Sequence, residues 1–465
     1  MTKMADTLPV DPRTIGTSIP PSLRELCQRF QSAGHGAWLV GGSLRDLCLG
    51  RPVADWDLAT TALPEQVCGL FSRVIPTGIE HGTVTVIWQS RPYEITTLRS
   101  EQGYSDGRRP DRVVFVKHIE EDLARRDFTV NALAYDPLTE FLVDPFSGLS
   151  DMQGRCLRTV GKPEDRFKED GLRVLRAARF VATLEFDLDD ATEAAIAPAL
   201  SVFRKVAHER VRDEWLKCMA ANAPSAGFEV MRRTGILGVT LPELLAQVGC
   251  DQNKWHAYDV WKHTLMCVDA LPANDSILRM AGLLHDLGKP QTRLFSDKTG
   301  DYTFYDHEKL GAEMADSWCE DYRFSNSDRM RIVHLVRHHL VCYSSEWSDS
   351  AVRRFVRRVG SEQVSDLLVL AEADARAKGR PVDAEVALLK ELQARIANIV
   401  EQNQPLRVRD LAINGRDLMQ HCQLAAGPQL GRVLDALLED VLEDPSLNQR
   451  EALLQRAMRH AKVLQ

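Results

Sequence analysis

The stretch from residue 37 to residue 60 constrains the fold of this chain more than any other part of the sequence. The apolar run from Ala37 to Val40 predicts a buried strand. Gly41 and Gly42 follow it, at a point where the backbone can approach a ligand closely. Ser43 is a residue type that caps helices, so we expect a short helix to open there with its free N–H groups facing that ligand.

Two carboxylates follow in the sequence Asp55-Trp56-Asp57. In a strand, residues two apart lie on one face, so we expect both side chains to project together. Two such charges repel each other unless a divalent cation lies between them, and Mg²⁺ prefers one or two carboxylates plus substrate phosphates. Each motif alone would fit an ordinary turn or a solvated strand end. In this order they predict nucleotidyl transfer with two metal ions.

Glu94 and the Arg125-Arg126 pair are the next candidates for the same site. The run from Tyr93 to Leu98 predicts a strand, on which Glu94 either completes the metal site or is an exposed strand residue. The segment Ile119–Ala134 is amphipathic and contains both arginines. Guanidinium groups match phosphate oxygens, although arginines on a surface helix would need no functional explanation.

From Glu164 onward the hydrophobic period changes to 3.6 and strands become rare. Four charged residues then recur at steps of three, so that neighbours in the series share a helical face, with Leu172, Leu175 and Phe180 expected to face elsewhere. An acid and an arginine one turn apart offer acceptor and donor groups for a nucleobase, and arginines further on would reach a triphosphate. The alternative is that these charged residues form a solvated ridge on the helix and bind no nucleotide. The series is Asp170, Arg173, Arg176 and Arg179.

Length and composition exclude some classes of protein. At 465 residues we expect several domains. The net charge is −8, so a nucleic-acid site must be a local basic surface. Ten cysteines without a C-x-x-C pair predict reduced thiols in a cytoplasmic protein. We expect no membrane partner, because no apolar stretch approaches the length of a membrane span.

A second set of candidate ligands lies in the histidine-rich half of the chain. His263 precedes the pair His285-Asp286, and Asp374 follows them. Imidazole and carboxylate groups that converge from several helices form divalent-metal sites. Three more histidines, His307, His338 and His339, lie between these residues in the sequence.

The motifs of the first half resemble those of the class II tRNA nucleotidyltransferases, the CCA-adding enzymes, with which bacterial poly(A) polymerases share their head. The resemblance implies an α+β fold, with a polymerase-β-like head containing a mixed β-sheet, followed by an all-α neck, body and tail. Six ordered segments carry it: Leu39–Asp46, Asp55–Asp57, Tyr93–Arg99, Arg125–Ala134, Glu169–Arg173 and His208–Arg212.

The same resemblance implies roles for individual residues. Asp55 and Asp57 would hold the Mg²⁺ ions, with Glu94 beside them. Asp170 and Arg173 would read the Watson–Crick edge of CTP or ATP. The remaining implied ligands contact the incoming nucleotide or its phosphates: Gly42, Arg45, Arg126, Arg176 and Arg179.

The histidine-rich half resembles the metal-dependent HD phosphohydrolase superfamily. The resemblance implies a divalent transition metal, of unknown identity, bound by His263, His285, Asp286 and Asp374. It also implies phosphatase and 2′,3′-cyclic phosphodiesterase activity. Lys289 is a candidate phosphate ligand. His307, with His339 or His338, is a candidate for a second metal.

These observations predict five segments and leave the activity open between related choices. The segments are a flexible lead-in (1–21), the nucleotidyltransferase head (22–150), a helical neck and body (151–250), the HD domain (251–380) and a helical tail (381–465). Family members that add only CC lack a loop like Ser100–Arg109, so its presence favours CCA addition to tRNA from CTP and ATP. A-adding enzymes, poly(A) polymerases and an HD phosphohydrolase with an RNA-binding head remain alternatives. The oligomeric state stays open.

Overall fold

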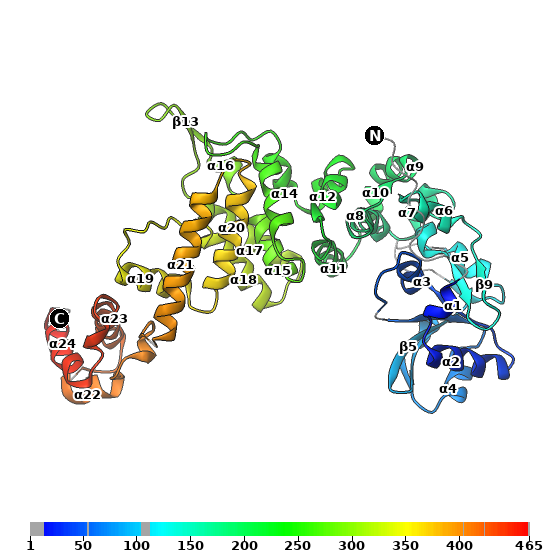
Figure 1. Ribbon diagram of the computed structural model, residues 1–465, viewed down its shortest axis with the longest axis horizontal. Coiled ribbons are helices and arrows are strands. Elements are labelled where there is room, and N and C mark those ends of the chain that lie inside the picture. The colour runs from blue at the N-terminus through cyan, green and yellow to red at the C-terminus, as the bar shows by residue number, and fades with distance from the viewer. Residues whose placement is uncertain (1–13, 54, 104–111, 403, 423, 464–465) are drawn as a thin grey trace. The chain divides into compact units, whose positions relative to one another are not determined.

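The chain forms two compact units, Met1–Pro242 and Glu243–Gln465, called here the first and the second unit. The structure, a computed structural model, describes residues 14–53, 55–103, 112–402, 404–422 and 424–463 (Figure 1). A mixed sheet lies in the first unit, and the second unit is almost wholly helical, so the predicted α+β class is confirmed. Within the described ranges, no helix is long and apolar enough to cross a membrane.

A seven-stranded sheet forms the centre of the first unit, in the order β3-β4-β5-β2-β1-β8-β9. Buried and less buried residues alternate along β4 and β5, as expected where one face of a sheet meets the core. A separate hairpin joins β6 (Arg99–Gln102) to β7 (Arg112–Phe115). The sheet strands are β1 (Ala37–Val40), β2 (Asp57–Thr60), β3 (Val74–Gly78), β4 (Thr83–Trp88), β5 (Arg91–Thr97), β8 (Ala134–Asp136) and β9 (Phe141–Val143).

Strands β2 and β5 run parallel, whereas the other neighbouring strands of this sheet are antiparallel. Their register pairs Asp57 with Glu94, which places both acidic residues at the same level of the sheet. Strand β2 begins at Asp57, so Asp55 lies just before the strand and not inside it, although its charge still acts on Asp57. Strand alternation applies only inside a regular strand, so it does not determine the direction of the Asp55 side chain.

Helices cover the sheet, and two of them, α3 and α5, have bounds that differ from the sequence prediction. Helix α3 begins at Gly41, and Ser43 lies inside it, where its hydroxyl donates to the Val40 carbonyl at 2.9 Å instead of capping the helix. Helix α5 ends at Ala124, before the arginine pair. The helices around the sheet are α1 (Ile15–Ser18), α2 (Pro21–Ser32), α3 (Gly41–Cys48), α4 (Pro64–Leu70), α5 (Ile119–Ala124) and α6 (Gly148–Gln153), with 3₁₀ turns η2 (Ile79–His81) and η3 (Thr129–Asn131).

The lead-in predicted to be flexible contains an ordered part. Ile15 and Ile19 are buried, and the Arg24 guanidinium donates to the Gly16 carbonyl at 2.9 Å, which fixes α1 against α2. The apolar side chains of α1 therefore belong to the core, although the prolines around them had favoured a loose segment. Residues 1–13 lie outside the described part of the chain.

The rest of the first unit is helical and built around α8, which packs against α10, α11 and α12. Gly171 precedes α8, and a Cβ there would lie 2.8 Å from the Phe203 backbone, so α10 and α8 meet closely. The apolar segment Phe228–Leu241 is divided between two helices near Gly235, whose φ is +84°. The elements are β10 (Cys156–Leu157), α7 (Pro163–Glu169), α8 (Leu172–Leu184), β11 (Asp187–Leu188), α9 (Asp190–Ala194), α10 (Ile196–Phe203), α11 (His208–Met219), α12 (Pro224–Arg233) and α13 (Leu237–Thr240).

The second unit starts with a group of packed helices that hold the histidine-rich motifs. Helix α14 packs against α15 and α20, and α18 packs against α15 and α17 (Figure 1). The elements, beginning with a 3₁₀ segment at the unit boundary, are η4 (Pro242–Gln247), α14 (Val260–Ala270), α15 (Ser276–Leu284), α16 (Lys289–Thr292), β12 (Leu294–Ser296), β13 (Asp301–Thr303), α17 (His307–Asp321), α18 (Asn326–His338), α19 (Asp349–Val359) and α20 (Val364–Ala377).

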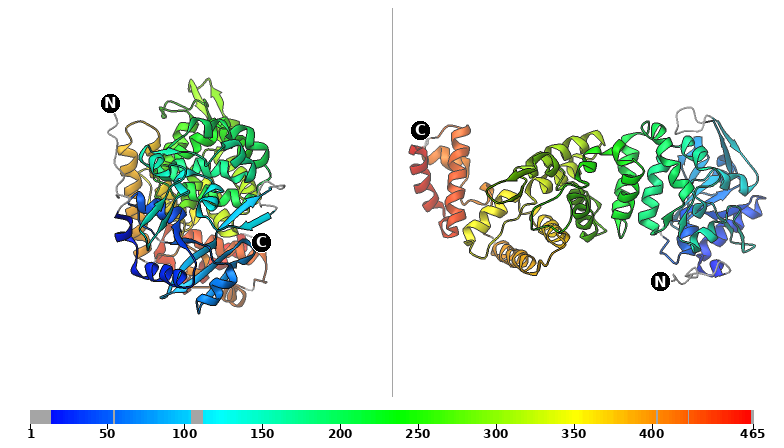
Figure 2. Two further views of the ribbon diagram at one scale, coloured as in Figure 1. Left: turned by 90° about the vertical axis from the view of Figure 1, so that its right-hand side faces the viewer. Right: turned by 90° about the horizontal axis from the view of Figure 1, so that it is seen from above.

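The end of the second unit is the long helix α21 and a small bundle of α22, α23 and α24, drawn from orange to red in Figure 2. One core of buried leucines, isoleucines and valines runs from α20 into this bundle. In the basic segment Arg353–Arg358 only Arg353 is buried among the arginines, and others pair with acids of α23. Arg353 donates to the Leu442 and Glu443 carbonyls, and Arg354 pairs with Glu439. The elements are α21 (Asp383–Glu401), η5 (Val408–Asp410), α22 (Gly415–Cys422), α23 (Pro428–Glu443), η6 (Pro445–Leu447) and α24 (Arg450–Val463).

Candidate active site and metal centre

A cavity of about 590 Å³ in the first unit collects most of the residues singled out from the sequence. The sheet contributes its acidic residues, α3 its Gly-Gly start, and α8 its arginines. Asp55 is not among the described residues that line this cavity. Those that do, out of the predicted set, are Gly42, Arg45, Asp57, Glu94, Arg126, Asp170, Arg173, Arg176 and Arg179.

Negative charge concentrates at Asp57. Burial, then the neighbouring Glu94 and Asp55, raise the pKa of the Asp57 carboxyl to about 6 against the pull of Arg126 and Arg45. Gly41, with φ of +70°, brings the backbone close to this group, because a Cβ there would lie 3.5 Å from Asp57 Oδ2. Crowded carboxylates with an elevated pKa are the donor set that a hard divalent cation such as Mg²⁺ relieves. These residues therefore fit Mg²⁺.

Two arginines lie close to the glycine turn, because a Cβ at Gly41 would meet Arg126 at 3.2 Å and a Cβ at Gly42 would meet Arg45 at 3.5 Å. Arg45 donates to Asp46 at 2.9 Å and to Asn131 Oδ1 at 2.7 Å. Arg126 donates to the buried Asp122 at 3.2 Å, and its Nε has no hydrogen-bond partner in the described part of the chain. Both guanidinium groups are thus held in place while part of their donor capacity faces the cavity.

Asp170 and Arg173 lie in this cavity, each held by a partner. Arg210 on α11 grips the Asp170 carboxylate at 2.8 and 3.3 Å, in the two-point geometry typical of arginine and carboxylate. Arg173 donates to Glu169 at 2.5 Å and to the Arg125 carbonyl at 3.0 Å. The turn between α7 and α8 therefore presents an acid and an arginine in fixed orientations.

The other two arginines of α8 are anchored by buried acids. Arg176 pairs with Asp127 at 2.5 Å, and Arg179 lies 2.6 Å from Glu214. The pKa of Asp127 is held below its usual range because Arg176 and Arg173 outweigh its burial. Phe180 also lines the cavity, with Arg179 3.8 Å above its ring centre, so the prediction that Phe180 faces elsewhere was wrong. Leu172 lines the cavity as well.

Sequence reasoning missed the acids and the arginine that hold this set in place. Asp127 follows the Arg125-Arg126 pair, and Arg210 lies inside the His208–Arg212 motif, so both were within segments already singled out. Nothing in the sequence indicated which partner each would take, because these pairs join α8 to distant elements. Glu214, buried one turn beyond Arg210, was not part of any recognised motif.

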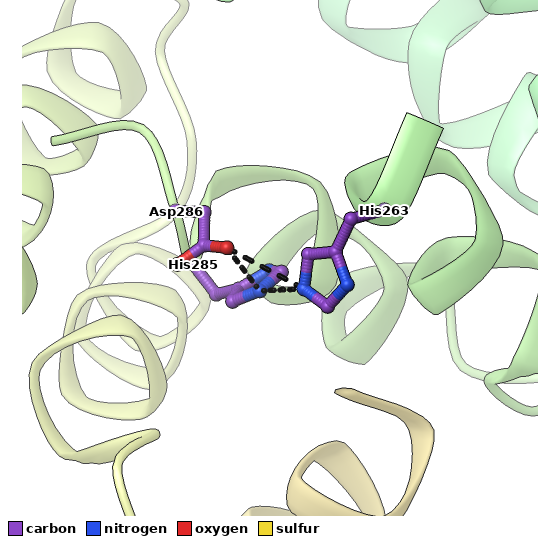
Figure 3. A group of neighbouring side chains, drawn as sticks. All are labelled: His263, His285 and Asp286. Carbon is purple, nitrogen blue, oxygen red and sulfur yellow. Dashed lines mark hydrogen bonds and ion pairs between the residues drawn. The ribbon is translucent and has the colours of Figure 1, made fainter. Parts of the chain in front are cut away.

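A second cluster of candidate ligands lies in the second unit. His263 on α14 and His285 at the end of α15 approach Asp286, with Nε2 atoms 3.4 and 3.1 Å from its Oδ2 (Figure 3). The two Nε2 atoms are 3.3 Å apart. Asp374 on α20 lies 3.0 Å from His263 Nε2. All four predicted ligands of the first metal are therefore neighbours.

The other oxygen of Asp286 faces two further histidines. His307 Nε2 lies 3.5 Å and His339 Nε2 3.7 Å from Oδ1, and these nitrogens are 3.2 Å apart. His338 belongs to neither of the ligand groups found among the described residues. Its ring packs against His334 instead, with centroids 4.5 Å apart. Asp286 thus stands between two sets of donors.

The surroundings of the cluster suit metal ligands. Nδ1 of His285, His307 and His339 each contacts a backbone carbonyl three residues earlier, at 2.6 to 2.7 Å, which fixes the tautomer with Nε2 toward the centre. Burial, with His285 nearby, lowers the pKa of His339 to about 3, so its imidazole is neutral. Both Asp286 oxygens are buried, and their polar neighbours are the histidine Nε2 atoms and the Lys289 ammonium. The donor set fits divalent metal ions.

Lys289 brings positive charge to the same place. Its Nζ lies 2.7 Å from Asp286 Oδ2 and donates to Gln252 Oε1 at 2.7 Å. Gly288 lets α16 approach α17, because a Cβ there would lie 2.4 Å from the His307 carbonyl oxygen. A cavity of about 340 Å³ opens beside the cluster and is lined by Asp286, His307, His339 and Asp374 together with Lys289.

Three family profiles match this chain in chain order. The poly A polymerase head domain matches residues 37–158, and the probable RNA and SrmB-binding site of polymerase A matches residues 185–247. The HD domain matches residues 255–379. The first carboxylate cluster lies within the first of these ranges, and the histidine cluster lies within the last.

Comparison with whole proteins decides the family. The chain is 32% identical to the CCA-adding enzyme of Lactiplantibacillus plantarum over 434 residues, which covers 93% of this chain and 94% of that protein. The chain belongs to the CCA-adding enzyme family. Similarity to the CCA-adding enzyme of Lactobacillus johnsonii is higher, 46%, but its alignment spans about half of that relative, 54%, and 47% of this chain.

A solved structure agrees with this family assignment. The CCA-adding enzyme of Bacillus stearothermophilus in complex with CTP matches with a TM-score of 0.74 and 27% identity, over 96% of this chain and 99% of that one. The Thermotoga maritima CCA-adding enzyme complexed with tRNA_CCA matches in fold, with a TM-score of 0.57 and 19% identity, over 97% of this chain and 98% of that one.

Proposed function

We propose that this protein adds C, C and A to the 3′ end of tRNA, with CTP and ATP as substrates and without a nucleic-acid template. The observation that carries the proposal is that one cavity holds a crowded carboxylate pair, four arginines and the Asp170–Arg173 turn. Its membership in the CCA-adding enzyme family supports the same activity, as does the matching Bacillus stearothermophilus structure in complex with CTP.

For this reaction the protein must position the substrates and neutralise the charge of the phosphates. Asp55 and Asp57, with Glu94 beside them, would hold Mg²⁺, which supplies neutralising charge to the triphosphate when bound. In the reaction the tRNA 3′-hydroxyl oxygen bonds to the α-phosphorus and loses its proton to solvent. The bond from that phosphorus to the bridging oxygen breaks, and pyrophosphate leaves with the electron pair.

In this proposal the arginines contact different parts of the incoming nucleotide. Arg126, Arg176 and Arg179 neutralise the phosphates, while Arg45 and the backbone at Gly42 contact the nucleotide. The Asp170 carboxylate and the Arg173 guanidinium offer acceptors and donors to the base. A base that leaves these groups unmatched is rejected strongly, because a polar group without a partner is costly in a site closed to water.

The experiment supplies tRNA ending at the discriminator base, at C or at CC, with each nucleotide separately, followed by sequencing of the products. CCA addition predicts two C residues and then one A. Incorporation of A alone onto tRNA ending in CC would identify an A-adding enzyme instead. Runs of A on unrelated RNA, with CTP ignored, would identify a poly(A) polymerase.

We also propose that the second unit hydrolyses phosphate esters with divalent metals. The carrying observation is Asp286, whose two buried oxygens face separate histidine pairs. In the reaction a water oxygen bonds to phosphorus, the ester oxygen leaves with the electron pair, and that oxygen takes the proton of the water. Lys289 would neutralise the phosphate. Release of product from 2′,3′-cyclic CMP or a nucleotide monophosphate with Ni²⁺, Mn²⁺ or Co²⁺, abolished by chelation, tests this activity and the metal.

The proposed domain partition is 22–150, 151–250, 251–380 and 381–465, and a cytoplasmic location is proposed for the whole chain. The substrates named above are intracellular, and all ten cysteines are free thiols. Limited proteolysis with mass mapping tests the partition, and cell fractionation tests the location.

A further inference from the structure

Four aromatic side chains, three of them exposed, lie at the second-unit cavity or next to residues that line it. Tyr305 lines the cavity although its residue is 78% exposed. Tyr302 also lines it and packs edge-on against Phe295, which is 60% exposed on the β12–β13 hairpin. Trp255, 64% exposed, lies in the chain between two residues that line the same cavity. We call Trp255, Phe295, Tyr302 and Tyr305 the aromatic rim.

Cations accompany these rings. The Arg293 guanidinium lies 3.8 Å from the ring centre of Tyr302, and Lys254 Nζ lies 5.2 Å from that of Trp255. The Lys254 backbone N–H donates to Asp301 on the hairpin at 2.9 Å, so the segment containing Trp255 is tied to β13. The rim is therefore one connected surface. Aromatic rings interleaved with arginine and lysine are the surface on which single-stranded nucleic acids stack their bases.

The position of the rings distinguishes a chain end from a single nucleotide. Trp255 and Phe295 are absent from the described lining of the cavity, so a mononucleotide held there by its phosphate would not reach them. An RNA whose terminal phosphate enters the cavity would carry its preceding bases across them. Exposed large aromatic residues gathered at one place on a surface are typical of a binding site.

We propose that the aromatic rim binds the single-stranded 3′ end of an RNA and delivers its terminal or 2′,3′-cyclic phosphate to the histidine–aspartate centre. This inference rests on the hydrolase function proposed above and narrows its substrate class to RNA ends. Tyr305, at the mouth, stacks the terminal base, and Trp255 and Phe295 stack the bases before it.

The test is steady-state hydrolysis by the full-length, metal-loaded protein of two substrates, a tetranucleotide ending in 2′,3′-cyclic phosphate and 2′,3′-cyclic CMP. We expect KM to be about tenfold lower for the tetranucleotide, from the energy of base stacking on aromatic side chains. Trp255→Ala and Phe295→Ala should remove that advantage with kcat unchanged. Leu294→Ala, an exposed apolar residue beside Phe295 on the same hairpin, is the matched control and should keep it.

Equal KM values for the two substrates, or variants that lower kcat equally for both, would overturn the inference while leaving the hydrolase intact. Should neither substrate be hydrolysed, the hydrolase function fails. A second measurement then still decides on the rim: photocrosslinking of a short RNA with 4-thiouridine near its 3′ end to the full chain, mapped by mass spectrometry. Crosslinks at Trp255, Phe295 or Tyr305 support RNA binding there, and crosslinks confined to other surfaces exclude it.

Discussion

Asp57 on β2 and Glu94 on β5 are register partners on two parallel strands, so two acids occupy neighbouring places on one face of the sheet. Burial and these neighbouring carboxylates raise the pKa of Asp57 to about 6. The pairing thus creates a local excess of negative charge that the fold of the first unit must tolerate when no cation is bound. The cost of this charge leads to a measurable dependence of stability on pH.

Asp57→Asn should stabilise the first unit at pH 8 in the absence of Mg²⁺. The folded pKa lies above the unfolded one, so the ionised group destabilises the folded state above pH 6, and this effect vanishes as the pH falls below about 4. The expected gain at pH 8 is about 1–3 kcal/mol. The measurement is urea unfolding at pH 8 and at pH 4. The transition that belongs to the first unit is identified as the one that CTP shifts.

Saturating Mg²⁺ should cancel the advantage of this variant, because the cation stabilises only the wild-type carboxylate cluster. The comparison is Asp55→Asn, which removes an exposed charge that acts on Asp57 and should therefore give a smaller gain of the same sign. An equal gain for Asp57→Asn at both pH values would show that the charge of this group is not the cause.

The carboxylate site of the first unit and the histidine–aspartate centre of the second unit should be inactivated independently of each other. Replacing both Asp55 and Asp57 by Ala should lower CTP and ATP incorporation at least 10³-fold, the order expected when charge stabilisation of a phosphoryl transition state is removed. Metal-dependent hydrolysis of 2′,3′-cyclic CMP should remain. Asp286→Ala should give the reverse pattern, because its carboxylate stands between both histidine pairs of the second unit. Loss of both activities in either variant contradicts a two-site protein.

The sequence predicted those parts of the nucleotide site that depend on local periodicity. It did not predict pairs between residues far apart in the chain. The strand, the Gly-Gly turn and the arginine series of α8 follow from local periodicity, and the structure places their side chains around one cavity. Phe180 was misplaced because a helix buried on several sides has no single apolar face, and its ring supports Arg179. The grip of Arg210 on Asp170 joins residues forty positions apart, and local pattern does not encode such pairs.

In the histidine cluster the sequence identified most of the neighbouring residues but not every one. The order of His263, His285, Asp286 and Asp374, through its resemblance to HD phosphohydrolases, was sufficient to predict four neighbouring donors. The sequence did not decide between His338 and His339, because two adjacent residues at a helix end differ only in the direction of their side chains. α18 ends at His338, and His339, at its C-cap, turns inward toward His307.

Arg210→Ala should weaken base selection more than catalysis in general. Arg210 is a positioning residue in our proposal, because it touches Asp170 and orients the carboxylate that reads the base. Without it we expect kcat/KM for CTP to fall about 10- to 100-fold, from the loss of charge-assisted hydrogen bonds. The preference for CTP over UTP should fall too, while KM for tRNA stays constant. Initial rates with each nucleotide measure both quantities.

Arg210→Lys should restore the rate in part but not the selectivity, since an ammonium cannot form the two parallel bonds. Arg232→Ala is the matched control, a partly exposed arginine on α12 paired with Glu229. A uniform loss for CTP and UTP in Arg210→Ala would assign to this residue a general charge effect in place of orientation.

Metal stoichiometry separates the two histidine pairs of the second unit. We expect two divalent ions per chain at this centre, counted by equilibrium dialysis and elemental analysis with Mn²⁺ or Ni²⁺ in the Asp55→Ala, Asp57→Ala background, which removes the first-unit site. His339→Ala should retain one ion, because His307 and Asp286 alone leave the second site short of donors. His338→Ala, one position away and packed on His334, should retain two. A wild-type count of one, unchanged in His339→Ala, would limit metal binding to His263, His285, Asp286 and Asp374.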